Sequence, residues 1–138
     1  MRRVFRLILT IALLLSITNA GGLAEAKAKS KKIKRQMTRA GYTFMGTKGK
    51  RLKNSTDKTF QLFLYKGNSY ALLGYGDNSV KDLDVQVYNS RWEIVKEDYS
   101  SSGPMYALRF KVKETGVYYV TTYMYKGSGY FFQSVGWK

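Results

Sequence analysis

The sequence predicts an all-β domain, an antiparallel two-sheet sandwich of about eight strands with a jelly-roll-like topology. From residue 42 onward, apolar and polar side chains alternate with a period of two, as in strands that turn one face to a core. Clusters of Asn, Gly, Ser and Asp interrupt the alternation, and such short linkers favour antiparallel neighbours. No helical periodicity intervenes, which favours a sandwich; an up-and-down barrel is the structural alternative.

Alternation also assigns faces to the expected strands. Leu83, Val85 and Val87 fall at every second position and are expected to point into the core. A slip of one residue in the sixth strand would bury Arg109 and Lys111, so the register there is well determined. The eight expected strands are Tyr42–Met45, Thr59–Tyr65, Ser69–Tyr75, Asp82–Tyr88, Trp92–Glu97, Met105–Val112, Val117–Tyr125 and Tyr130–Trp137.

Residues 1–26 are expected to form a cleaved secretory signal peptide. Basic residues at the start precede a largely apolar stretch, residues 7–17, which is shorter than the ~20 residues needed to span a bilayer. Small residues in the pattern of a cleavage site end at Ala20 and at Ala26, and the second is preferred. We therefore expect a periplasmic or extracellular protein whose mature part has no transmembrane segment.

Charge divides the expected mature chain into two parts. Residues 27–53 contain eleven Lys and Arg and no acidic residue, whereas residues 54–138 contain ten basic and eight acidic residues, a net charge of +2. We predict a basic lead-in, residues 27–41, followed by a nearly neutral β-domain, residues 42–138. Export and the near neutrality of the folded part make nucleic acid an unlikely partner.

The lead-in is predicted to be a short helix that begins near Ser30 and stops at Gly41. Ile33, Met37 and Ala40 form a narrow apolar stripe on it, which could simply rest on the domain. Alternatively, its cations contact an anionic surface such as lipid or another envelope polymer; the stripe is too narrow for deep insertion, so that contact would be peripheral and salt-sensitive. The residues expected to make it are Lys31, Lys32, Lys34, Arg35 and Arg39.

The chain contains no cysteine and no histidine. Disulfides, thiolate metal sites and catalysis through Ser-His-Asp or Cys-His pairs are therefore excluded, and we expect no enzyme. The one cofactor considered is calcium, because Asp77 lies in a turn and Asp82 and Asp84 share the outer face of the next strand; calcium prefers such oxygen ligands. The alternative is that these carboxylates cap the turn and pair with neighbouring cations.

Three tyrosines are the candidate ligand-binding residues. If the buried positions of the seventh strand begin at Tyr118, then Tyr119, Tyr123 and Tyr125 emerge together on its outer face. Flat amphipathic rings in a row can stack on sugar rings or pack on a partner chain. The alternative is cross-strand aromatic packing that stiffens a domain without disulfides.

The segments Asn68–Asp77, Lys81–Tyr88 and Thr115–Val120 resemble the bacterial pre-peptidase C-terminal domains, which carry a "G-x-x-Y-x-L" strand, a "D-L-D-x-x-x-Y" strand and a "G-x-Y-x-V" strand. The resemblance covers roughly residues 48–125 and implies a jelly-roll-like sandwich that binds or assists and does not catalyse. With no protease domain in this chain, we expect a non-catalytic exported binding module with a glycan or protein partner. The alternative is a structural envelope protein held electrostatically by its basic segment.

Overall fold

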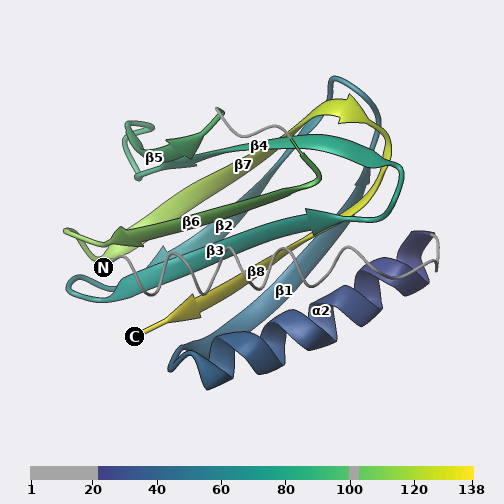
Figure 1. Ribbon diagram of the computed structural model, residues 1–138. Coiled ribbons are helices and arrows are strands. Elements are labelled where there is room, and N and C mark those ends of the chain that lie inside the picture. Colours follow the sequence, from purple (N-terminus) through teal and green to yellow (C-terminus); the bar gives the residue numbers. More distant parts are fainter. Residues whose placement is uncertain (1–21, 100–102) are drawn as a thin grey trace.

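The computed structural model describes residues 22–99 and 103–138, so most of the expected signal peptide lies outside the described residues. Two four-stranded antiparallel sheets pack face to face (Figure 1), which confirms the predicted eight-stranded sandwich. Sheet A has the order β1-β8-β3-β6, and sheet B has the order β2-β7-β4-β5. The elements are α2 (Gly22–Arg39), β1 (Thr43–Leu52), β2 (Asp57–Leu64), β3 (Ser69–Gly76), β4 (Val80–Tyr88), β5 (Ile94–Asp98), β6 (Met105–Lys111), β7 (Gly116–Gly127) and β8 (Gly129–Trp137).

The space between the sheets is an aliphatic and aromatic core with a polar trio at its centre. The hydroxyl of Tyr106 (β6) lies 2.7 Å from the hydroxyl of Thr122 (β7) and accepts a hydrogen bond of 2.9 Å from the Gln133 amide (β8). All three side chains are buried, and burial raises the pKa of Tyr106 to about 12. The hydroxyl is therefore neutral and joins the two sheets by hydrogen bonds.

Helix α2 lies along the outer face of sheet A, against β8, β1 and β3 (Figure 1). Ile33 and Met37, two residues of the predicted stripe, are buried against Leu73 and Tyr75 of β3. Strand β3 consequently has a buried neighbour on both of its faces, and every residue after Ser69 is buried. The helix is thus an integral layer of the fold.

The helix is longer than the sequence predicts. It begins at Gly22, eight residues before the expected N-cap Ser30, whose hydroxyl instead lies 3.4 Å from that of Thr47 on β1. It ends at Arg39, and Gly41 follows with a φ of 87°, the left-handed conformation that favours glycine at a helix C-terminus. The predicted stop is correct, and the predicted start is wrong.

Contacts of Glu25 explain the early start. Its side chain is fully buried; one carboxylate oxygen lies 2.9 Å from the Lys29 ammonium, and the other accepts a 3.2 Å hydrogen bond from the backbone N–H of Asn78. The Lys29 ammonium also donates to the carbonyl oxygen of Gly76 at 2.9 Å. These bonds fasten the first turns of α2 to the loop between β3 and β4.

Several strand boundaries also differ from the prediction, and two of the differences bear on the surface of the molecule. Strand β1 runs to Leu52 instead of Met45, since its pairing with β8 carries it through a run without apolar alternation. It is an edge strand, and Lys48 and Lys50 lie on it; lysines on an edge oppose pairing with another chain. Strand β5 begins at Ile94, which leaves Trp92 in the preceding turn.

Candidate binding face

No helix of the described residues covers the outer face of sheet B, and the side chains of this face form rows across the strands. We call this surface the sheet B face. The register of β2, β7, β4 and β5 places them in three rows: Asp57, Tyr123 and Asp84; then Thr59, Thr121, Gln86 and Glu97; then Gln61, Tyr119 and Tyr88. A row of hydrogen-bonding groups thus lies between two rows that contain tyrosines.

Hydrogen bonds order the middle row. The hydroxyls of Thr59 and Thr121 lie 2.8 Å apart, and the Gln86 amide donates to the Glu97 carboxylate at 3.0 Å. The Tyr88 hydroxyl donates to the carbonyl oxygen of the same Gln86 amide. Side chains held in this way are ordered before any ligand arrives, which lowers the entropic cost of binding.

The three predicted tyrosines lie on the outer side of β7. Tyr119 and Tyr123 are half-buried, and Tyr125 is 61% exposed. The rings of Tyr123 and Tyr125 have centroids 6.5 Å apart and are tilted by 54°. The alternate residues of β7, from Tyr118 to Met124, are buried, as the predicted register requires. That these rings bind a ligand remains a prediction.

Trp92 belongs to the face, although the sequence predicts it in a strand and the structure places it in the turn before β5. Its ring stacks on that of Tyr119, with centroids 4.0 Å apart and an angle of 8° between the planes, and it lies 5.6 Å from the Tyr88 ring. A tight turn positions the Trp92 ring over Tyr119. In this turn the Asn89 side-chain oxygen accepts hydrogen bonds from the backbone N–H groups of Arg91 and Glu93, both at 3.0 Å.

The backbone of Trp92 has a φ of 59°, which is uncommon for a bulky residue. Such strain persists where the surrounding structure holds it, and it is concentrated at functional sites. The ring is nevertheless 56% exposed, so its burial offsets the strain only in part. Alternation of apolar residues carries no signal for a left-handed conformation, so the sequence pattern could not place Trp92 over β7.

Asp84 is the other unforeseen residue of the face. The sequence predicts an outward side chain in water, yet the residue is only 5% exposed, and its Oδ1 accepts no hydrogen bond from the part of the chain that the structure describes. Burial, followed by repulsion from Asp82 and Asp98, raises its pKa from 3.8 to about 6. The side chain is thus a crowded carboxylate at the end of the tyrosine row.

The three predicted calcium ligands do not form a metal site. Asp77 is buried at a turn, where its Oδ1 accepts a 2.8 Å hydrogen bond from the Ser79 N–H and its Oδ2 a 3.1 Å bond from the Tyr130 N–H. Across residues 22–99 and 103–138, no three His, Cys, Asp or Glu side chains are arranged to hold a metal ion. Asp77 therefore acts as the turn cap that was the alternative to calcium binding.

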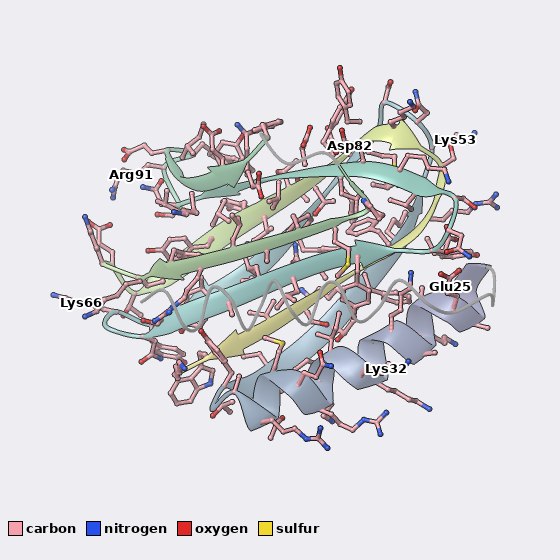
Figure 2. All side chains as sticks on the ribbon, viewed as in Figure 1. Glu25, Lys32, Lys53, Lys66, Asp82 and Arg91 are labelled. Atoms are coloured by element: carbon pink, nitrogen blue, oxygen red, sulfur yellow. The ribbon has the colours of Figure 1, made fainter. Side chains whose placement is uncertain are left out.

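The basic side of the molecule lies on α2. The five cations predicted to contact an anionic surface, Lys31, Lys32, Lys34, Arg35 and Arg39, are all exposed. Lys32 extends away from the sandwich, and Asp82 lies on the opposite side (Figure 2). The carboxylates of Glu25 and Asp77 are buried and bonded, so the exposed acidic charge comes from sheet B and the adjoining loops.

A cavity of about 330 Å³ opens between β5 and β6, lined in part by Ile94, Val95 and Tyr118. The Arg91 guanidinium at its rim is paired with the carboxylates of Glu93 at 2.9 Å and Glu114 at 3.1 Å. The charge of this guanidinium is thus already compensated within the chain, and the sheet B face is the better candidate.

Solved structures share this fold at low sequence identity. The pre-peptidase C-terminal domain of a Bacillus anthracis collagenase superposes with a TM-score of 0.55 and 15% identity, covering 65% of this chain and 87% of that domain. PliG of Aeromonas hydrophila, a periplasmic inhibitor of g-type lysozyme, superposes with a TM-score of 0.52 and 9% identity, covering 72% of this chain and 90% of PliG. The mitogen of Yersinia pseudotuberculosis gives a TM-score of 0.52 and 11% identity, covering 69% of this chain and 86% of the mitogen.

The fold is therefore a β-sandwich like that of pre-peptidase C-terminal domains, as the sequence motifs predict. No protein-family model matches the sequence, and none of the curated proteins matches it. Within the described residues, no helix is both long and apolar enough to cross a membrane.

Proposed function

We propose that the protein is an exported, non-catalytic binding module that holds a polymeric glycan on the sheet B face. The observation that carries this proposal is the pairing of outward aromatic rings with an ordered polar row on the uncovered sheet. Trp92, Tyr119 and Tyr123 supply rings on which sugars can stack. Gln86 and Glu97 supply amide and carboxylate groups to which sugar hydroxyls can hydrogen-bond.

A glycan fits this face better than a folded protein partner does. The centres of protein interfaces are apolar and depleted of charge, whereas the central row here consists of hydroxyls, an amide and a carboxylate. Tyr119 and Tyr123 are four residues apart, about 13 Å at the rise of a strand, so an extended polymer could contact both. A protein partner remains the alternative occupant, since the similar fold of PliG is that of a lysozyme inhibitor.

Tyr119→Thr and Tyr123→Thr test the proposal, because threonine keeps a high β propensity. Each variant should lose roughly 5- to 150-fold in glycan affinity, the range for one aromatic anchor, while its melting temperature stays nearly constant. Tyr130→Thr is the matched control: this ring is also half-buried, but it lies on sheet A beside Arg51. A glycan array, followed by calorimetric titration, measures the affinities.

A drop in melting temperature with unchanged binding would show that the rings only stiffen the sheet. An array without any glycan ligand would contradict the proposal outright.

The exposed cations of α2 support a second candidate, a structural envelope protein held at anionic surfaces. Attachment through these side chains should collapse at high salt, where charges more than a few ångströms apart are screened. Replacing Lys31, Lys32 and Arg35 by Gln should weaken binding to anionic lipid vesicles and leave glycan binding unchanged. Retention that ignores both salt and these substitutions would contradict this candidate.

A further inference from the structure

In the first row of the sheet B face, the carboxylate of Asp84 forms no ion pair with any of the described residues. We propose that Asp84, with the tyrosine rings beside it, is a subsite for a protonated amino group. The ligand would then be a polymer with free amino groups, such as a glycan of amino sugars whose nitrogen is not acylated. This inference rests on the proposed function and names the ligand class for the same face.

The row supplies both the charge and the walls of such a subsite. Tyr123 of β7 lies in register between Asp57 of β2 and Asp84 of β4, so a carboxylate flanks the ring on each side. Tyr99 follows β5 and is 49% exposed; partial burial, and to a smaller extent the nearby charges that include Asp84 and Asp57, raises its pKa. Ammonium groups bind to aromatic faces as well as to carboxylates.

Within residues 22–99 and 103–138, Asp84 has no ion-pair partner that would explain its burial. Its Oδ1 is buried and makes no hydrogen bond. The ion pairs of the described residues involve Glu25, Glu93 and Glu114, and none involves Asp84. Lys126, which lies opposite Asp82 in the register, forms no ion pair with it. A buried carboxylate without a partner is costly, and a ligand cation would remove that cost.

Two other occupants fit the row less well. A calcium ion takes six to eight oxygen ligands, and no metal-binding group of carboxylates exists in the described residues. A neutral sugar hydroxyl could donate to Asp84 but would leave the charges of Asp82 and Asp84 uncompensated. An ammonium group donates up to three hydrogen bonds and carries the opposite charge. It can therefore both donate a hydrogen bond to Asp84 and compensate the negative charge.

The test compares two glycans of equal length, glucosamine hexamer and N-acetylglucosamine hexamer, by calorimetric titration of the mature protein just below neutral pH, where the Asp84 carboxyl, with a pKa of about 6, is mostly ionised. The native protein should bind the free amino form about tenfold more tightly, which is the scale of one charge-assisted contact. Asp84→Asn keeps the shape of the side chain and should remove this preference while binding to the acetylated hexamer persists. Glu114→Gln, a carboxylate-to-amide change away from the row, should leave the preference intact.

The outcomes separate this inference from the proposed function. Equal affinity for both hexamers, or a preference that survives in Asp84→Asn, would overturn the amino-group subsite and leave glycan binding standing. Binding of a lysine oligomer through Asp84 without binding of either hexamer would overturn the glycan proposal and the amino-sugar ligand together. Stabilisation by calcium that is lost in Asp84→Asn would replace the ammonium by a metal ion.

Discussion

The outer faces of the two sheets differ although both sheets have four antiparallel strands. In sheet A the central strand β3 is buried along nearly its whole length, because the core lies on one side and α2 on the other. In sheet B the strand β7 alternates between buried and partly exposed residues, because no helix of the described residues packs on its outer side. The helix therefore turns one potential binding surface into interior, and the aromatic and acidic surface of sheet B is left for a ligand.

The largest expected change in the free energy of unfolding concerns the outer face of sheet A, which α2 covers. Leu73→Ala, beneath α2, should cost about 3 kcal/mol in the free energy of unfolding, because Leu73 is 1% exposed and its loss leaves a cavity. Thr121→Ala at the centre of the sheet B face should cost less than about 1 kcal/mol. Urea denaturation of both variants measures the difference. Similar costs for the two would show that α2 does not hold its place on sheet A.

An intermediate effect concerns where the helix starts. A chain that begins at Gly21 keeps the buried contacts of Glu25, whereas a chain that begins at Lys27 loses them and leaves the Asn78 N–H without its acceptor. We expect the shorter chain to be less stable by about 2 kcal/mol. We therefore favour cleavage after Ala20 over the site at Ala26, and mass spectrometry of the exported protein can check this. A mature chain that starts at Lys27 with undiminished stability would contradict it.

The smallest expected effect concerns Asp84 on the sheet B face. Here the substitution should raise the free energy of unfolding, whereas the two changes above should lower it. The folded state raises the pKa of Asp84 from 3.8 to about 6, so it binds the proton more tightly than the unfolded state does. The contribution of Asp84 to stability is therefore highest below about pH 4 and is lost as the pH rises through about 6. Asp84→Asn removes this loss and should raise the free energy of unfolding by about 1 kcal/mol at neutral pH.

Denaturation at acidic and at neutral pH measures that gain, which should be absent at acidic pH. Asp77→Asn is the control, since Asp77 accepts two backbone hydrogen bonds, and its replacement should destabilise the protein. If Asp84→Asn also destabilises the protein at neutral pH, then the ionised Asp84 carboxylate stabilises the folded state, which would contradict this prediction.

Strands whose two faces differ in polarity could be predicted from the sequence. The alternation in residues 82–88 and 117–124 assigns buried and exposed positions that the structure reproduces, except at Asp84, which is buried. Strand β1 was predicted too short, because its pairing with β8 determines its length and its own side chains do not alternate. The first turns of α2 were assigned to the signal peptide, because Ala24 and Ala26 match a cleavage site as well as they match a helix.

The candidate site was predictable only in part. The outward direction of Tyr119 and Tyr123 follows from register within one strand. The burial of Asp84 and the stacking of Trp92 on Tyr119 depend on other strands and on a turn with a left-handed residue. Such properties arise from neighbours that are distant in sequence, so local patterns do not contain them.

The polar trio at the centre of the sandwich fixes how the two sheets align. Aliphatic layers tolerate many rearrangements of similar buried area, so hydrophobic filling alone would permit several alignments of sheet A on sheet B. A shift would separate the Tyr106 hydroxyl from Thr122 and leave a neutral polar group unpaired in a dry interior. Over evolutionary time, the surrounding aliphatic residues can therefore exchange with one another, while the trio preserves a single alignment in a chain that has no disulfide to do so.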